Sequence, residues 1–197
     1  MSQSELLVII ASTRPGRVGL PVGRWFEDAA RRHGKFEVRV ADLSEINLPI
    51  FNEPHHPATR QYVHDHTKKW SQIVAAADAF ALVTPEYNFG PTPALVNAMN
   101  YVYHEWTYKP AGFVSYGGIS GGLRAVQMTK LLLTTLKIMP MVEAVTIPNV
   151  QQMIEKDASG TPALFKAGEI QEKAAKAMLD ELLKWANALK AMRTPAA

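Results

Sequence analysis

The chain has 197 residues, of which 47% are hydrophobic, and this suits one compact domain over residues 1–197 with a substantial core. It contains no cysteine, which excludes disulfides, thiolate-bound zinc, iron–sulfur clusters and cysteine nucleophiles, so any redox chemistry must come from a bound group. The net charge of +3 arises from 21 Lys and Arg that are spread along the chain instead of gathered in a tract, which argues against nucleic acid as a partner and suits anionic small molecules.

The first predicted element is a strand over residues 6–11, a short apolar run typical of a strand covered on both faces. A polar loop, residues 12–19, follows it. Positions at helical spacing from Val22 to His33 then predict a helix, and Pro21 fits its first turn. The order is therefore strand, loop, helix.

The same order repeats in the next part of the chain. The sequence predicts a strand over residues 36–41, a Pro-rich loop to Pro57, a helix to about Ala77 and an apolar strand over residues 79–83. A third loop leads into another helix. The apolar stripe of that helix is formed by Leu95, Met99, Val102 and Trp106.

The last part predicts a strand over residues 112–115, a helix over 121–137 and a closing strand over 142–147. A linker with the turn-forming residues Asp157, Ser159, Gly160 and Pro162 comes next. In the final helix, one face carries Met178, Leu182, Trp185 and Leu189.

Five strands that alternate with five helices predict an α/β fold with a doubly wound parallel sheet, because right-handed crossovers place helices on both faces. In such sheets the ligand lies beyond the carboxyl ends of the strands, where the strand order reverses. The informative loops are therefore those after strands one, three and four.

Nothing in the sequence predicts secretion or a membrane span. Residues 1–5 contain no basic segment leading into an apolar stretch, and no run of about 18 apolar residues occurs. We therefore expect a cytoplasmic protein.

The loop at residues 12–19 has the composition of a phosphate site. It leads into a helix start, whose free N–H groups and positive dipole end attract anions. The hydroxyl of Ser12 can hydrogen-bond phosphate oxygens, as can that of Thr13, while Arg14 and Arg17 can add charge-assisted contacts. The alternative is a polar turn that only caps the helix.

The loop at residues 84–93 contains three prolines, which stiffen it and favour a preformed platform. Tyr87 and Phe89 could stack on a flat ring, and Asn88 could meet the polar edge of that ring. The alternative is that the prolines shape a connection and the aromatic side chains fill the core.

The loop at residues 115–122 contains four glycines, which allow the backbone to approach a ligand closely. Residues 118–122 also match G-x-S-x-G, the turn that carries the serine nucleophile of α/β-hydrolases. In those enzymes the catalytic histidine follows the serine, whereas all six histidines here precede Ser120, the last being His104. The order disfavours a hydrolase, which we keep as an alternative. The glycines form neither a dinucleotide-binding fingerprint nor a P-loop.

Two further clusters carry weaker signals. The histidines at 55, 56, 64 and 66 could suggest a metal site, but residues two apart on a helix face different directions, so surface or interface histidines are expected. The aromatic run from Tyr101 to Tyr108 exceeds what one helix face can bury in a monomer, which indicates a subunit contact.

Together, the three loops resemble the NADPH-dependent FMN reductase family, whose relatives include azo and quinone reductases. The resemblance covers about residues 6–150. Its most specific part is the segment 85–88, Pro-Glu-Tyr-Asn, followed by Pro93, Leu95 and Asn97. The supporting parts are Ser12-x-Arg14 and the glycine pairs 117–118 and 121–122 with Arg124.

This resemblance implies a flavodoxin-like fold with strand order 2-1-3-4-5. It implies that the phosphate of FMN is held by Ser12, Arg14, Arg17, Val18 and Gly19. It also implies ring contacts from Pro85, Glu86, Tyr87 and Asn88, with Ser115, Tyr116, Gly117 and Gly118 bordering the other side of the ring. No metal is implied.

The implied activity is an NAD(P)H-dependent FMN reductase that passes electrons from NADPH or NADH through FMN to a small acceptor, such as a quinone, a flavin or an azo compound, with ping-pong kinetics. In this scheme FMN carries the chemistry and no catalytic side chain is needed. The family also implies a homodimer or homotetramer. The main alternative is a non-catalytic flavodoxin-type electron carrier with the same fold. Such carriers tend to be acidic, and this chain is not.

Overall fold

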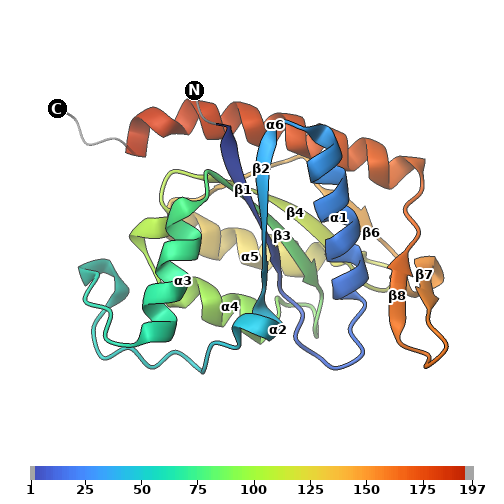
Figure 1. The fold of residues 1–197 in the computed structure, drawn as a ribbon, viewed down its shortest axis with the longest axis horizontal. Helices are drawn as coiled ribbons and strands as arrows, with labels where there is room; N and C mark the ends of the chain where they lie inside the picture. The colour runs from blue at the N-terminus through green and yellow to red at the C-terminus, as the bar shows by residue number, and fades with distance from the viewer. Residues whose placement is uncertain (1–2, 194–197) are drawn as a thin grey trace.

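A computed structural model describes residues 3–193, and its centre is a parallel β-sheet (Figure 1). The strands of this sheet are β1 (Ser4–Ile10), β2 (Phe36–Asp42), β3 (Ala79–Pro85), β4 (Pro110–Tyr116), β5 (Met139–Pro140) and β6 (Val145–Ile147). Their order is β2-β1-β3-β4-β5, with β6 also on β4. The predicted doubly wound order 2-1-3-4-5 is therefore confirmed, and the strand order reverses between β1 and β3.

Helices cover both faces of the sheet, as predicted. The helices are α1 (Gly19–His33), α2 (Leu43–Ile46), α3 (Asp65–Ala76), α4 (Pro93–Asn100), α5 (Leu123–Thr135) and α6 (Glu169–Arg193). One apolar core lies between the sheet and helices α1 and α6, and a second lies between the sheet and helices α3, α4 and α5. Strand β1 contributes to both cores because alternate residues, such as Leu6 and Leu7, point to opposite faces.

The fifth strand is divided, which differs from the single strand predicted over residues 142–147. Strand β5 pairs with the beginning of β4, and β6 pairs with its end. Residues 141–144 between them are not in a strand. Pro140 lacks an N–H group, so it cannot extend a ladder of hydrogen bonds, and edge positions tolerate such interruptions.

Helix α4 is shorter than its apolar stripe predicts, because it ends at Asn100. Two buried indoles donate to its last carbonyl groups: Trp70 Nε1 to Ala98 O at 2.8 Å and Trp106 Nε1 to Met99 O at 3.2 Å. Trp106 lies in a separate 3-10 helix, His104–Trp106, and it is still buried. The stripe therefore identified core residues correctly but placed the helix end wrongly.

Helix α3 begins at Asp65, later than the start predicted just after Pro57. Residues 57–59 form a 3-10 turn instead. The buried carboxylate of Glu53 accepts hydrogen bonds from the N–H groups of Val63 and His64, which holds this approach in an extended form. Helix α5 likewise begins at Leu123 and not at 121, because Gly121 and Gly122 both have positive φ.

The predicted linker after the fifth strand is an antiparallel hairpin of β7 (Ile154–Lys156) and β8 (Pro162–Phe165). Its turn is closed by Asp157, whose carboxylate accepts from the N–H groups of Ser159 and Thr161. Figure 1 shows the hairpin beside α1. The Phe165 ring packs edge-on against Trp25 of α1, with ring centroids 5.1 Å apart.

Candidate functional site

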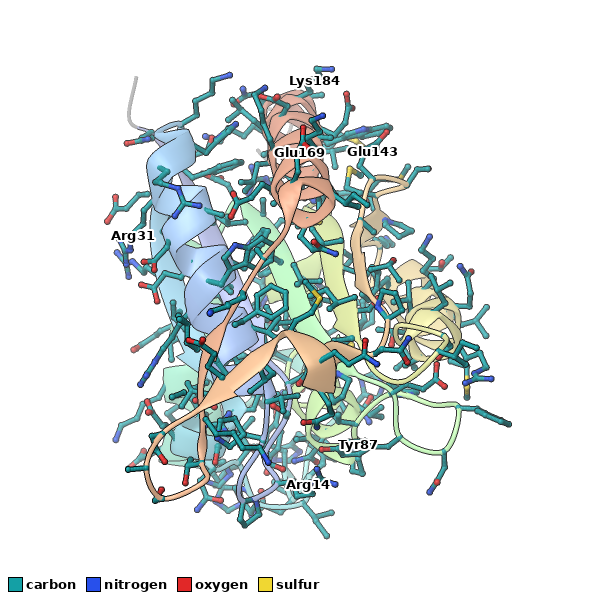
Figure 2. The ribbon with its side chains drawn as sticks, turned by 90° about the vertical axis from the view of Figure 1, so that its right-hand side faces the viewer. Arg14, Arg31, Tyr87, Glu143, Glu169 and Lys184 are labelled. Carbon is teal, nitrogen blue, oxygen red and sulfur yellow. The ribbon has the colours of Figure 1, made fainter. Side chains whose placement is uncertain are left out.

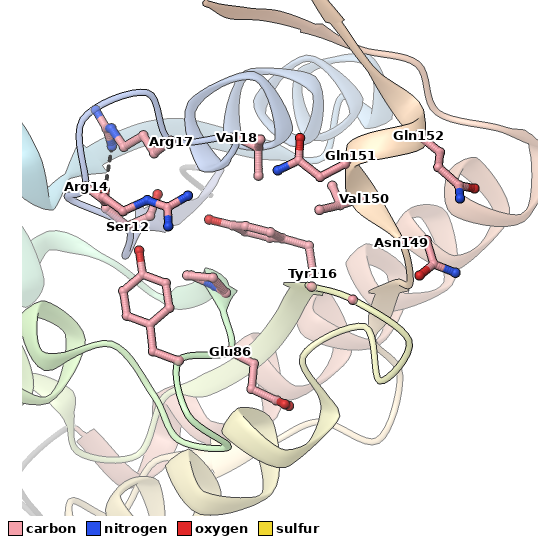
Figure 3. Close-up of a pocket in the computed structure, with 14 residues that line it drawn as sticks. Ser12, Arg14, Arg17, Val18, Glu86, Tyr116, Asn149, Val150, Gln151 and Gln152 are labelled. Atoms are coloured by element: carbon pink, nitrogen blue, oxygen red, sulfur yellow. Dashed lines mark hydrogen bonds between the residues drawn. The ribbon is translucent and has the colours of Figure 1, made fainter.

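A cavity of about 380 Å³ opens at the carboxyl edge of the sheet, beside the strand-order reversal. Figure 2 shows Arg14 and Tyr87 together at this end of the molecule, with Lys184 at the opposite end. The lining residues come from the last positions of β3 and β4 and from the segments after β1, β3, β4 and β6 (Figure 3). They are Ser12, Arg14, Arg17, Val18, Pro85, Glu86, Tyr87, Tyr116, Gly117, Gly118, Asn149, Val150, Gln151 and Gln152.

Arg17 anchors the loop after β1 to the end of β2. Its guanidinium makes two hydrogen bonds of 2.6 Å to the buried carboxylate of Asp42, and it also donates to Ser12 O at 2.7 Å. Asp42 in addition accepts from Ser44 N, so it caps α2. The bond to Asp42 is the main reason that the pKa of Arg17 is raised. Arg17 therefore fixes the shape of the loop.

Two buried hydroxyls at this loop lack a well-formed hydrogen bond within the described residues: those of Ser12 and Tyr116. Both lie against Gly19, where an added Cβ would stand 2.1 Å from Ser12 Oγ and 2.2 Å from Tyr116 Oη. Burial raises the pKa of Tyr116, and the neighbouring Ser12 hydroxyl opposes this rise. Because a buried polar group without a partner is costly, these hydroxyls are suited to a ligand.

The start of α1 is open to an anion. Its N-cap, Val18, makes no side-chain hydrogen bond to the helix, and no acidic residue lies in the first turn. Arg14 is exposed on the same loop, and no residue in the range 3–193 forms an ion pair or hydrogen bond with its side chain. A helix start, two free hydroxyls and an unpaired guanidinium therefore meet in one corner of the cavity.

The loop after β3 forms a tight turn that carries one wall of the cavity. Tyr87 and Gly90 exchange two backbone hydrogen bonds, of 3.0 and 2.9 Å, around Asn88 and Phe89. Both central residues have positive φ, 48° and 69°. This is the geometry of a type I′ turn, which needs residues that tolerate left-handed backbone. Tyr87 lines the cavity, whereas the side chain of Asn88 is exposed at the tip of the turn.

Glu86 lies in the wall, with its side chain turned away from Tyr116 (Figure 3). Its carboxylate accepts from Arg124 Nε at 2.7 Å, from Arg124 N at 3.1 Å and from Ser120 Oγ at 3.2 Å. These bonds, above all those of the Arg124 side chain, hold the pKa of Glu86 below its usual range. What Glu86 offers to the cavity is therefore its backbone.

The opposite wall is the Gly117–Gly118 segment, which is joined to the segment after β6. Val150 N donates to Gly117 O at 3.0 Å, and Asn149 N donates to Gly118 O at 2.8 Å. Nothing lies within 4 Å of where a Cβ of Gly118 would stand, so this backbone faces open space. Its N–H group makes no hydrogen bond to the described residues. The loop therefore offers a free donor in a fixed wall.

One wall of the cavity was not predicted from the sequence and is formed by Asn149, Val150, Gln151 and Gln152. These residues follow β6, and Figure 3 shows the amide of Gln151 directed over Tyr116. The signal was present, since a Pro-Asn turn at residues 148–149 follows the fifth strand and every strand of a parallel sheet ends at this edge.

Three of the predicted site residues do not line the cavity: Gly19, Asn88 and Ser115. Gly19 lies beneath the two hydroxyls. Ser115 is fully buried in β4, and its Cβ is 3.1 Å from where a Cβ of Gly122 would stand. It therefore faces the start of α5. The other ten predicted residues come together around the cavity, as the spacing of the loops led us to expect.

The hydrolase alternative gains nothing from the geometry. The Ser120 hydroxyl donates to Glu86, and no histidine is among the residues that line the cavity. Within residues 3–193, no group of three or more His, Cys, Asp or Glu side chains is arranged to hold a metal.

The histidine cluster and the aromatic run differ from what their spacing predicted. The rings of His64 and His66 do not face different directions, because His64 precedes α3 with extended backbone and stacks on His66 with the ring centroids 5.1 Å apart. Tyr101 and Trp106 are buried within this chain, because the run does not form one helix. The aromatic run therefore gives less support to a subunit contact than expected.

A doubly wound sheet of order 2-1-3-4-5 with a cavity at its switch point defines a flavodoxin-like α/β protein. The particular family follows from comparison with known sequences. The model of the NADPH-dependent FMN reductase family matches residues 4–152, and the chain belongs to this family.

Curated relatives agree with this assignment. An NAD(P)H-dependent FMN reductase of Schizosaccharomyces pombe is 35% identical over 147 residues, which are 73% of this chain and 74% of that protein. A second one, from Nectria sp., is 31% identical over 141 residues, 68% of this chain and 70% of that protein. The predicted NAD(P)H-dependent FMN reductase activity, with FMN and NAD(P)H as cofactors, is therefore confirmed.

Solved structures confirm the fold. FerB, a flavoenzyme NAD(P)H:(acceptor) oxidoreductase of Paracoccus denitrificans, has a TM-score of 0.72 at 18% identity, covering 94% of this chain and 98% of FerB. A WrbA-like flavodoxin of Agrobacterium tumefaciens has a TM-score of 0.58 at 15% identity, covering 95% of this chain and all of that one. In the part of the chain that the structure describes, no helix is long and apolar enough to span a membrane.

Proposed function

We propose that the cavity at the carboxyl edge of the sheet is the FMN site of this reductase, and that a small electron acceptor is reduced there. The observation that carries the proposal is the pair of buried, unpartnered hydroxyls, Ser12 and Tyr116, beside the open start of α1. They fit a phosphorylated ligand because both can donate to an oxygen, while the helix start supplies positive potential.

The phosphate end of the ligand is assigned to the loop after β1. Ser12 would donate its hydroxyl, Arg14 would supply a charge-assisted contact, and the backbone at Val18 and Gly19 would offer the N–H groups of the helix start. Arg17 would act on the same phosphate through the loop, which its bonds to Asp42 keep in shape.

The ring end is assigned to the space between the two walls. On one side it would meet Pro85, the backbone of Glu86 and the ring of Tyr87, with Asn88 fixing the turn behind them. On the other side lie Tyr116, Gly117 and Gly118, which Ser115 supports from within β4. The free N–H of Gly118 can donate to a polar edge of the ring.

When bound, FMN supplies the redox chemistry, which is to take two electrons from the nicotinamide and to give them to an acceptor. The protein binds and orients both partners at one open cavity. Because a single cavity serves both, we propose that oxidised nicotinamide leaves before the acceptor enters, which gives ping-pong kinetics. We propose small, flat acceptors such as quinones, flavins or azo compounds, because an acceptor that shares the site with FMN has to enter beside the bound ring.

The test is direct. Freshly purified protein, or protein given FMN, is expected to show the visible spectrum of a bound flavin, and anaerobic NADPH is expected to bleach it. Protein that is colourless and does not bind FMN even at high concentration would overturn the proposal.

A turnover measurement distinguishes the reductase from the alternative, a non-catalytic electron carrier. The reductase should consume NAD(P)H steadily with a quinone, free flavin or azo dye as acceptor. If FMN-loaded protein shows no turnover with any of these acceptors, it is instead an electron carrier.

We also propose that the protein forms a homodimer or homotetramer and is located in the cytoplasm. The oligomer is tested by sedimentation of FMN-loaded protein at several concentrations. A monomer at all concentrations would contradict the assembly.

A further inference from the structure

The carboxylate of Glu86 lies where three segments of the chain meet. It belongs to the segment that leaves β3, it accepts from the Ser120 hydroxyl in the loop after β4, and it accepts from the backbone N–H of Arg124 in the first turn of α5. Helix α5 has Gly122 as its N-cap, with no side-chain cap of its own. Glu86 therefore caps α5 from another segment of the chain.

The side chain of Arg124 strengthens this junction. Its Nε donates to Glu86 Oε1 at 2.7 Å, and its terminal nitrogen forms an ion pair with the same oxygen. The guanidinium also lies over the ring of Phe89, 3.9 Å from the ring centroid. Phe89 has a φ of 69°, which is unfavourable for a bulky side chain, so this contact helps to hold the turn.

Both walls of the cavity are thus joined through one carboxylate. One wall, which contains Tyr87, follows Glu86 directly in the chain. The other wall, Gly117–Gly118, is two residues before Ser120, which donates to Glu86. The carboxylate is directed away from Tyr116, toward its donors Ser120 and Arg124 (Figure 3).

We propose that Glu86 and Arg124 are positioning residues that set the separation of the two cavity walls, and thereby the affinity for FMN. This inference rests on the FMN site proposed above. The pair acts through Tyr87 and the Gly117–Gly118 backbone and touches no reacting atom. A carboxylate that accepts several hydrogen bonds is held in one geometry, whereas an amide in its place must present an N–H group to one of these donors.

The test uses variants Glu86→Gln and Arg124→Gln, alone and together, with FMN affinity measured by quenching of flavin fluorescence. Each single variant is expected to bind FMN about tenfold more weakly, since a hydrogen-bonded charge has lost its partner. The double variant is expected to bind about as weakly as either single variant, because the two residues act as a unit. Losses that simply add would contradict the proposal.

Matched controls come from an ion pair on the surface of α1, Glu27 with Arg31. Glu27→Gln and Arg31→Gln are expected to leave FMN affinity unchanged, because this pair is far along the helix from its start and is exposed to solvent. Arg124→Lys keeps the charge but not the paired donors, so it should restore the affinity only in part.

A pH profile separates positioning from general loss of stability. In the wild-type protein, Arg124 is the charged group that faces the carboxylate of Glu86 and keeps it ionised. The affinity for FMN should therefore show no titration of Glu86 between pH 5 and 8. In Arg124→Gln the carboxylate loses its cation and its main side-chain donor, so its pKa should rise, and the part of the pH profile of FMN affinity that depends on Glu86 should shift to higher pH than in the wild type. The double variant, Glu86→Gln with Arg124→Gln, should lack this Glu86-dependent part of the pH profile.

Failure of this inference is distinguishable from failure of the FMN site itself. If wild-type protein does not bind FMN, the site proposal fails. If the wild type binds FMN and the Glu86 and Arg124 variants bind it equally well, only the positioning role fails. Hydrogen exchange in the FMN-free protein adds an independent measurement, since faster exchange is expected at residues 87–90 and 117–122 of the variants and unchanged exchange would contradict the coupling.

Discussion

At the scale of single residues, the site divides into side chains whose polar atoms are satisfied by the protein and side chains whose polar atoms are not. Arg17 and Glu86 belong to the first kind, because each is fully engaged by a partner of opposite charge. Ser12, Tyr116 and Arg14 belong to the second. The first kind gives the cavity its shape, and the second kind is available to a ligand.

Arg14 provides a prediction that separates phosphate recognition from ring recognition. Because its guanidinium is unpaired and lies on the loop at the start of α1, Arg14→Ala should weaken FMN binding about tenfold or more. Binding of riboflavin, which lacks the phosphate, should change by less than about twofold. The two constants are measured by fluorescence titration.

The matched control for this prediction is Arg24→Ala, which removes an exposed arginine from α1 outside the cavity lining. It should affect neither ligand. Equal losses of FMN and riboflavin binding in Arg14→Ala would remove the phosphate assignment.

The residues that come together at the cavity could largely be predicted from the sequence, but their hydrogen-bond partners could not. The loops at the strand ends contain hydroxyls, arginines and glycines, and ten of the thirteen predicted residues line the cavity. The partner of Arg17 is 25 residues away in the sequence, and that of Glu86 is 38 residues away. No local pattern in the sequence links such distant positions, so the sequence did not indicate that a protein partner holds each of these side chains.

At the scale of elements, periodicity predicted which segments are helical, whereas tertiary contacts decided where two helices begin and end. Helix α1 follows its apolar pattern over its whole length. The start of α3 depends on Glu53, and the end of α4 depends on the indoles of Trp70 and Trp106. A sequence pattern does not record such distant caps, so errors concentrate at element boundaries.

The β7–β8 hairpin gives a prediction at this scale. Phe165 is almost fully buried against Trp25, whereas its neighbour Leu164 is 52% exposed. Phe165→Ala should therefore lower the free energy of unfolding by about 3 kcal/mol through lost burial and a cavity. Leu164→Ala, the matched control on the same strand, should cost less than about 0.5 kcal/mol.

Chemical denaturation measures both changes. If the two variants are equally stable, the hairpin is not docked on α1 through Phe165. Because the cavity wall at residues 149–152 leads directly into β7, Phe165→Ala should also weaken FMN binding.

At the scale of the whole molecule, the alternation of strands and helices was enough to predict the architecture. The handedness of parallel crossovers leaves few ways to connect such units, and the observed order β2-β1-β3-β4-β5 is one of them. The hairpin and the division of the fifth strand were not predictable, because short edge strands carry little periodicity. The cavity wall at residues 149–152 was not predicted either.

Lys109 links the stability of the whole molecule to pH. It lies just before β4, at the amino edge of the sheet, and its side chain is buried. Its ammonium donates to Val74 O at 2.9 Å and to Ala75 O at 3.0 Å, near the end of α3. Burial lowers the pKa of Lys109 to about 8, so the folded protein carries this charge at a cost at neutral pH.

The sign of the effect follows from proton binding. The pKa of lysine in an unfolded chain is about 10.4. Between that value and the folded pKa of about 8, the unfolded state binds more protons, so folding becomes more favourable as the pH rises. Relative to Lys109→Met, which cannot titrate, the wild type should gain about 2 to 3 kcal/mol of stability from pH 7.5 to 10.5. Urea denaturation of both proteins across this range measures the difference, in which the titrations of all other groups cancel. Parallel stability curves would mean that Lys109 keeps its ordinary pKa and is not desolvated in the fold.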